Sequence, residues 1–143
     1  MSIWFAPPDL AAMTKSASAT MPGFLDIEFT EHGDDWISAR MPVNARVHQP
    51  YGRLHGGASV VLGETVGSTG AALTVDQSTH GCVGMEINAN HLRPVRDGYV
   101  TCTATRESAG RTTQVWSWKI VDDAGKLVCI GRITMAVIEN ARR

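Results

Sequence analysis

Glu64 is the only charged residue between Ala58 and Val75, in a segment of small, aliphatic and hydroxyl-bearing residues. A segment that is apolar all round is typical of a buried helix, and an ionised carboxylate is costly to bury without a partner. A carboxylate kept in such a place can serve as a nucleophile or as a general base. The alternative is a salt bridge at a surface or an interface, and spacing alone does not decide between the two interpretations.

A turn rich in Pro and Gly, residues 49–57, precedes this segment. The first N–H groups of a helix are unpaired and lie at the positive end of its dipole. Without a Cβ, Gly56 can bring its N–H close to a substrate carbonyl and hold a developing oxyanion. Glu64 lies about two helical turns further on, too far to reach that carbonyl within one chain. The alternative is that Gly56-Gly57 has only a structural role, as a tight turn into the helix.

Five further polar residues are weaker candidates, three of them in or beside this segment and two beyond it. Gln49 and His55 flank the glycine turn, and Ser68 lies one turn beyond the glutamate. Taken alone, each is most simply explained as a structural hydrogen bonder. His91 and Arg93 end a predicted strand and share a face, because alternate strand residues point the same way. Basic residues in such a place are usually just solvated.

Composition excludes several classes of function. The 143 residues carry a net charge of -1, with 43% apolar and 19% charged residues, which predicts a soluble globular chain without a nucleic-acid footprint. The N-terminus does not have the pattern of a signal peptide, and the Glu and glycines of residues 58–75 argue against a membrane span. Three cysteines without a C-x-x-C pair predict buried thiols in a reducing cytoplasm. Five histidines without a ligand cluster make a metal site unexpected.

Hydrophobic periodicity predicts the elements that position these residues. A short helix capped by Asp9 is expected over Pro8 to Lys15, and a long helix from Gly56 or Gly57 to near Asp76. Six strands are expected at residues 24–30, 36–41, 82–92, 99–106, 111–122 and 126–138, with a hairpin at 122–125. The last four are predicted to form an antiparallel meander.

The predicted elements give an α+β fold in which one long central helix is wrapped by a curved antiparallel sheet of about six strands. Gly63, Gly67 and Gly70 share one helix face, and three costly glycines there predict a close approach by the sheet or a second helix. We expect a single domain over residues 1–143, with residues 1–20 as an N-terminal arm and 139–143 as a short tail. A helix wrapped in this order is the hot-dog arrangement.

Two sequence blocks closely resemble the hot-dog acyl-CoA thioesterases of the PaaI type: residues 49–68, QPYGRLHGGASVVLGETVGS, and residues 83–93, VGMEINANHLR. A weaker third block lies between Gly110 and Trp116. Within that family the chain looks most like 1,4-dihydroxy-2-naphthoyl-CoA hydrolases, enterobactin proofreading thioesterases and Arthrobacter-type 4-hydroxybenzoyl-CoA thioesterases. Thr65 departs from the Ser that relatives often carry, and the family varies where Pro94 and Val95 stand.

The resemblance implies hydrolysis of an acyl-CoA to a free acid and CoA, without metal or redox cofactor. It makes Glu64 the nucleophile or general base, Gly56 N–H the oxyanion donor, Gln49 an orienting hydrogen bonder and His55 a helper at the thioester oxygen or thiolate. The site lies between the helix start of one subunit and the Glu of the other. A homodimer is therefore implied, and relatives often pair dimers into tetramers.

The resemblance also implies residues that bind the substrate. It assigns the acyl group to four of them: Ser68, Thr65, His91 and Arg93. Because CoA carries phosphates, basic side chains and exposed N–H groups are expected near the pocket mouth. The candidates for CoA are Arg93, Gly110, Arg111, Thr112 and, more weakly, Arg106.

The acyl group stays open, with aromatic groups favoured by the resemblance and medium-chain groups next. A serine esterase is excluded, because the chain has no G-x-S-x-G motif. A hot-dog hydratase or dehydratase is the nearer enzymatic alternative. A non-catalytic acyl-CoA-binding module is the alternative from another class, and it has no need of Glu64.

Overall fold

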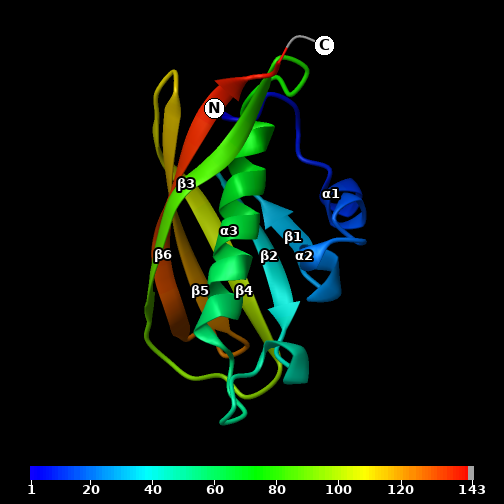
Figure 1. The fold of residues 1–143 in the computed structure, drawn as a ribbon, viewed down its shortest axis with the longest axis vertical. Coiled ribbons are helices and arrows are strands. Elements are labelled where there is room, and N and C mark those ends of the chain that lie inside the picture. Colours follow the sequence, from blue (N-terminus) through cyan, green and yellow to red (C-terminus); the bar gives the residue numbers. More distant parts are fainter. Residues whose placement is uncertain (142–143) are drawn as a thin grey trace.

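The computed structural model describes residues 1–141, and its centre is one long helix lying on a six-stranded antiparallel sheet (Figure 1). The helices are α1 (Leu10–Ser16), α2 (Met21–Phe24) and α3 (Gly56–Leu73), with a 3-10 turn at Ala45–Val47. The strands are β1 (Glu28–His32), β2 (Trp36–Pro42), β3 (His80–His91), β4 (Tyr99–Ala109), β5 (Thr113–Asp122) and β6 (Leu127–Glu139).

The glycines of α3 let the sheet approach the helix closely. A Cβ built on Gly63 would lie 2.7 Å from the ring of Trp118, and one on Gly70 would lie 2.9 Å from the ring of Trp116. At Gly67 the neighbour is Ile133, at 2.7 Å. Both tryptophans and Ile133 are fully or almost fully buried. The glycine spacing therefore predicted the packed face correctly, and these aromatic and aliphatic side chains fill the core between helix and sheet.

The sheet has the strand order β1-β2-β4-β5-β6-β3, so the expected meander of four strands is wrong. Strands β4, β5 and β6 do form a meander, but β3 pairs with β6 at the far edge. Residues 92–98, which join β3 to β4, are too long for a tight hairpin. Leu92 N–H donates to Val128 O, and Leu54 N–H donates to Val95 O. These hydrogen bonds hold the connection against the start of α3, on its way to β4 beside β2.

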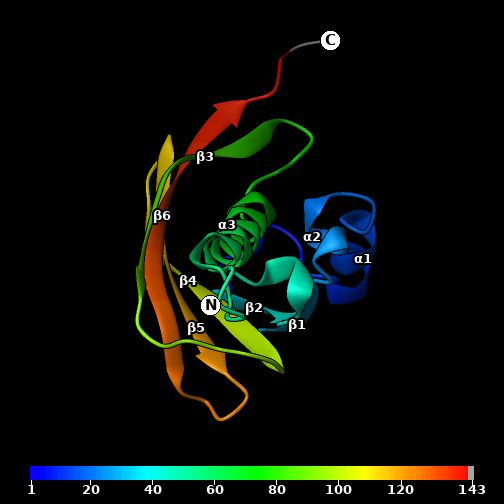
Figure 2. The same ribbon diagram turned by 60° about the horizontal axis from the view of Figure 1, so that its bottom comes forward.

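The N-terminal arm lies on the side of α3 away from the sheet (Figure 2). Helix α1 is capped as predicted, since Asp9 Oδ1 accepts from Ala12 N–H at 3.1 Å. The strand expected at residues 24–30 is wrong in its first half, where α2 ends at Phe24 and a turn follows. Pro22 has its φ fixed for a first helical turn, and Asp26 has a positive φ of 56°. Regular extended structure therefore begins only at Glu28.

The ends of the other elements also differ slightly from expectation. Helix α3 ends at Leu73 instead of Asp76, because Thr74 caps it and Asp76 accepts from Ser78 in the next turn. Glu139 belongs to β6 and not to the tail, of which residues 142–143 lie outside the described residues. The hairpin at 122–125 is confirmed, with Gly125 at a φ of 76°.

Across residues 1–141, no helix is both long and apolar enough to cross a membrane.

Candidate active site

The first turn of α3 presents an unpaired backbone donor. His55 is its N-cap, and the Nδ1 atom accepts from Gly57 N–H at 2.8 Å. Ala58 N–H and Ser59 N–H donate to His55 O. Within residues 1–141 no acceptor takes the N–H of Gly56. That N–H thus stands alone at the positive end of the helix dipole, where it can stabilise negative charge.

The imidazole of His91 lies directly beside this turn. A Cβ built on Gly56 would be 2.8 Å from His91 Nε2, which shows how closely the ring covers the glycine. On the ring's other side, Nδ1 lies 3.6 Å from Cys129 Sγ. Burial raises the pKa of the Cys129 thiol. A larger residue at position 56 would therefore displace the His91 ring from its present place.

A cavity of about 430 Å³ opens at this end of α3, with Gln49, Gly56, His91 and Arg93 among its lining residues. Gln49 is oriented by its own loop, because its Oε1 accepts from Tyr51 N–H. His55 does not line this cavity. The remaining lining residues come from the turn, from α3 and from the β3 and β6 ends: Arg53, Leu54, Ser59, Leu92, Pro94 and Val128.

Glu64 lies at the middle of α3 without a cationic partner. Its Oε1 accepts from Ser68 Oγ at 3.2 Å. A Cβ built on Gly84 of β3 would lie 2.6 Å from the same oxygen. None of the salt bridges found in the described part of the chain includes Glu64. The salt-bridge interpretation of this residue is therefore not realised within one chain, and the carboxylate stays available for chemistry.

A second cavity, of about 320 Å³, lies between the middle of α3 and the N-terminal arm. Thr65 and Ser68 line it, as do Met13 of α1 and Phe29 of β1. The Thr65 hydroxyl donates to Val61 O at 2.7 Å, so it bonds within its own helix. The predicted acyl contacts thus divide between two cavities, with His91 and Arg93 in one and Thr65 and Ser68 in the other.

One chain does not bring Gly56 and Glu64 together. They are eight residues apart on one straight helix, which places them about 12 Å apart along its axis. The cavity at Gly56 and the cavity lined by Thr65 and Ser68 share no lining residue, and Glu64 lines neither of them. An oxyanion held at Gly56 and a carboxylate at Glu64 therefore belong to two separate half-sites of the single chain.

The predicted CoA residues are also divided. Arg93 lines the cavity at the start of α3. Gly110, Arg111 and Thr112 form the turn between β4 and β5, at the other end of the sheet (Figure 1). Thr112 O accepts there from Val137 N–H near the end of β6. Arg106 lies towards the same end, and its N–H donates to Asp35 O.

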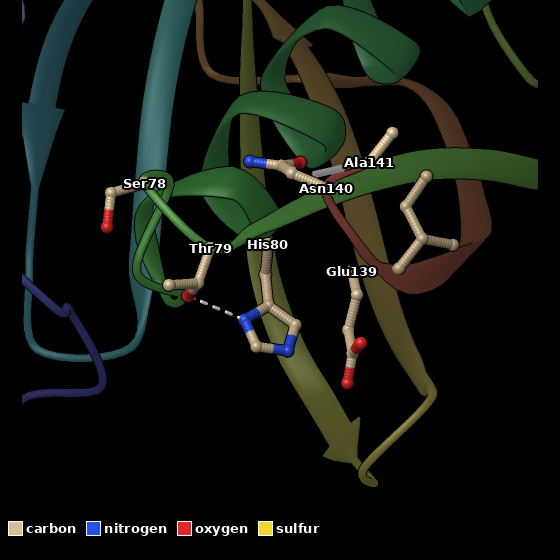
Figure 3. Close-up of a pocket in the computed structure, with 7 residues that line it drawn as sticks. Ser78, Thr79, His80, Glu139, Asn140 and Ala141 are labelled. Atoms are coloured by element: carbon tan, nitrogen blue, oxygen red, sulfur yellow. Dashed lines mark hydrogen bonds between the residues drawn. The ribbon is translucent and has the colours of Figure 1, made fainter. Parts of the chain in front are cut away.

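A larger cavity, of about 1020 Å³, contains none of the predicted residues. Figure 3 shows it beside the start of β3 and the end of β6, lined by Ser78, Thr79, His80, Ile138, Glu139, Asn140 and Ala141. His80 Nδ1 and Thr79 Oγ1 are 2.8 Å apart.

Residues 1–141 hold no group of three or more His, Cys, Asp or Glu side chains suited to a metal ion.

Two residues at the half-sites, Gly84 and Cys129, were not predicted from the sequence. Gly84 lies inside the second sequence block, and a glycine within a strand indicates a bulge or a close approach. The register of β3 against β6 does shift between Gly84 and Glu86. Cys129 gave no local signal, because its contact with His91 depends on the pairing of β3 with β6. The contacts of both residues, Gly84 with Glu64 and Cys129 with His91, exist only in the folded chain.

Comparison with known proteins finds that the chain is similar to thioesterases. Residues 51–129 match the family model described as "Thioesterase superfamily". A Q49A variant of a Pseudomonas aeruginosa thioesterase superposes with a TM-score of 0.96, at 47% identity over 97% of this chain and 100% of that one. The 1,4-dihydroxy-2-naphthoyl-CoA hydrolase of Escherichia coli is 43% identical over 95% of this chain and 99% of its own length. The proofreading thioesterase EntH of Cronobacter turicensis is 40% identical over 95% and 98%.

Proposed function

Because the chain belongs to the thioesterase superfamily and is a hot-dog thioester hydrolase, we propose that its substrate is an aromatic acyl-CoA, with medium-chain acyl-CoA the next candidate. The name of the Escherichia coli relative specifies a naphthoyl thioester, which supports an aromatic acyl group. The enzymatic character of the family argues against a purely binding module. We further propose that no metal or redox cofactor takes part, and that the enzyme works in the cytoplasm, where free cysteines stay reduced.

The separation of Gly56 from Glu64 carries the mechanistic proposal. Two copies must combine, so that the helix start of one faces the glutamate of the other. Gly56 N–H then holds the thioester oxygen as negative charge develops on it. Glu64 of the second copy attacks the carbonyl carbon directly or takes a proton from the attacking water. The carbon–sulfur bond breaks, and CoA leaves as the thiolate. When water is the nucleophile, this step releases the free acid. After direct attack by Glu64, a water molecule hydrolyses the acyl–Glu64 anhydride, which releases the acid and regenerates the carboxylate.

The edge strand β3 supports self-association. It pairs only with β6 among the described strands, so its outer edge presents free backbone groups. Residues 83–86 of this strand are exposed on both faces. Val83 is 48% and Met85 63% exposed, an unusual state for large apolar side chains beside a half-site. We propose a homodimer formed through β3, with dimers pairing further into a tetramer.

Substrate contacts follow from the two half-sites. The acyl group lies towards Ser68 and Thr65, and His91 and Arg93 line the entrance at the start of the partner helix. Among the residues predicted to bind CoA, Arg93 is the one that lines this cavity, where it can meet a CoA phosphate. The turn of Gly110, Arg111 and Thr112, with Arg106, contributes only if the subunit that supplies Glu64 also brings this end of its sheet to the CoA.

Mixed dimers test the composite site. Glu64→Gln and Gln49→Ala chains are purified separately, mixed, exchanged under mild denaturant and assayed for release of the CoA thiol. A mixed dimer has one site with both halves intact and one with both halves damaged. With random exchange, activity should rise from near zero to about a quarter of wild type, since half of the dimers are mixed and each has one working site.

The outcome separates the two arrangements. If each site is built within one chain, mixing restores nothing beyond the sum of the two variants. Wild-type chains carried through the same exchange control for loss during refolding. A panel of benzoyl-, hydroxybenzoyl-, naphthoyl- and straight-chain acyl-CoAs then ranks the acyl groups, and faster turnover of the straight-chain members would contradict the aromatic proposal. Dialysis against a chelator should leave the rate unchanged if no metal takes part.

A further inference from the structure

His91 and Cys129 form a contact that the proposed chemistry leaves unused. They are direct partners in the pairing of β3 with β6, so their side chains project to the same face. Cys129 Sγ lies 3.6 Å from His91 Nδ1. Cys129 is fully buried, whereas His91 is exposed and lines the cavity at the start of α3. The pair thus links the core of the sheet to the half-site at Gly56.

We propose that Cys129 is a positioning residue: its thiol donates a hydrogen bond to His91 Nδ1 and so keeps the proton of the neutral imidazole on Nε2. A neutral imidazole has one donor and one acceptor nitrogen. The hydrogen bond made by one nitrogen decides which of them carries the proton. Cys129 does not touch the substrate in this arrangement and acts only through His91.

The direction of this hydrogen bond follows from the surroundings of the sulfur. Burial raises the pKa of the Cys129 thiol, so the sulfur keeps its hydrogen at neutral pH. A thiol is a weak donor, and the histidine nitrogen is the polar acceptor that faces it. In the opposite arrangement, His91 Nδ1–H would donate to Cys129 Sγ, which is a weak acceptor. The thiol hydrogen would then no longer have His91 Nδ1 as its acceptor.

The consequence lies at the other ring nitrogen, which is the one beside Gly56. A Cβ on Gly56 would be 2.8 Å from Nε2, so an Nε2–H would stand next to the unpaired N–H of the helix start. This step rests on the proposed function: the two donors together bind the thioester oxygen or a polar group of the acyl ring. The same cavity also contains Arg53 and Arg93, which add positive charge near His91.

The ring nitrogens of His91 can be observed directly. Nitrogen-15 NMR of the unliganded wild-type enzyme, labelled in histidine, should show His91 protonated at Nε2 when neutral. Loss of the His91 resonances in a His91→Gln sample assigns them. Observation of the Nδ1–H tautomer in wild type would overturn the proposal. No substrate is present, so this readout is independent of the proposed reaction.

Variants of the two buried cysteines then test the donor. Cys129→Ala removes it and should shift part of His91 to the other tautomer and lower kcat/KM about threefold to tenfold, as expected for one hydrogen bond. Cys129→Ser keeps a donor and should restore both values. Cys102→Ala is the matched control, since Cys102 is equally buried and faces Cys129 across Ile120 of β5.

The control distinguishes positioning from packing. Cys102→Ala should cost stability, measured by thermal unfolding, without changing the His91 tautomer or kcat/KM. If Cys102→Ala lowers kcat/KM as much as Cys129→Ala, or if Cys129→Ser behaves like Cys129→Ala, the thiol acts only through packing and the proposal is wrong. Full activity of Glu64→Gln would instead contradict the proposed function, while leaving the tautomer result standing.

Discussion

The first turn and the middle of α3 differ in the kind of group that each offers for the proposed chemistry. At Gly56 the reactive group is a backbone N–H, and the side chain is absent because His91 occupies its place. At Glu64 the reactive group is a side chain, and the space it needs comes from another glycine, Gly84 of β3. In the proposed mechanism, the helix end supplies its oxyanion donor from the backbone. The middle of the helix has only paired N–H groups, so a carboxylate must provide the chemistry there.

The comparison also shows what each region requires of its neighbours. His55 caps the first turn by accepting from Gly57 N–H, which leaves the Gly56 donor unused. In the middle, the Ser68 hydroxyl donates to the carboxylate. The first region is thus held by a cap and the second by a single hydroxyl. Substitutions in the two regions should therefore differ in size and in the parameter they change.

Glu64→Gln should have the largest effect, because it removes the group that we propose attacks the thioester or activates the attacking water. We expect kcat to fall by a hundredfold or more, in keeping with the usual contribution of a nucleophile or general base. CoA thiol release under saturating substrate measures it. Glu31→Gln is the control, since Glu31 is exposed on β1. Equal activity of the two variants would show that the middle of α3 carries no chemistry.

Gly56→Ala should come next. The new Cβ would lie within 2.8–2.9 Å of two atoms of the His91 ring, so the ring must leave its place beside the N–H. We expect kcat/KM to fall about tenfold to a hundredfold, less than or comparable to loss of a whole oxyanion donor. Thermal stability should not fall in parallel, because Ala favours a helix over Gly. A variant that unfolds easily and keeps its turnover would contradict this assignment.

Gly84→Ala should affect the middle region while leaving the first turn intact. Its Cβ would lie 2.6 Å from Glu64 Oε1, so the flexible carboxylate must swing away from Ser68. We expect kcat to fall about tenfold, within the range for a displaced catalytic group, with KM little changed. Gly81→Ala on the same strand is the matched control, because its Cβ meets only Asn140 Oδ1 at 3.4 Å. A similar loss in both variants would point to general damage to β3.

Ser68→Ala should have the smallest effect of the series. It removes one hydrogen bond to Glu64, which is worth about 1 kcal/mol, or roughly a fivefold change in kcat. Ser117→Ala on β5 serves as the control, because the Ser117 hydroxyl also donates to a carboxylate, that of Glu107 on β4. A loss as large as that of Glu64→Gln would mean that Ser68 takes part in the reaction itself and does more than orient the carboxylate.

Much of the fold could be predicted from local patterns. The cap at Asp9, the hairpin before Gly125 and the glycine face of α3 each depend on short-range geometry, and each is confirmed. The first strand was misplaced at its start because residues 25–29 alternate between apolar and acidic side chains, whereas Pro22 starts a helical turn that ends at Phe24. Alternation reports which residues are apolar, and over so few positions it does not distinguish a strand from a short helix.

For the candidate site too, some features follow from the sequence and others only from the fold. By itself, the sequence determined that Glu64 is a lone carboxylate on a glycine-rich helix and that Gly56 opens that helix, because residue type and helical spacing are local properties. Only the tertiary structure decided that β3 crosses to the far edge of the sheet. That crossing puts His91 against Gly56, Cys129 against His91 and Gly84 against Glu64. Such contacts depend on strand order, which is set by packing between residues far apart in the chain.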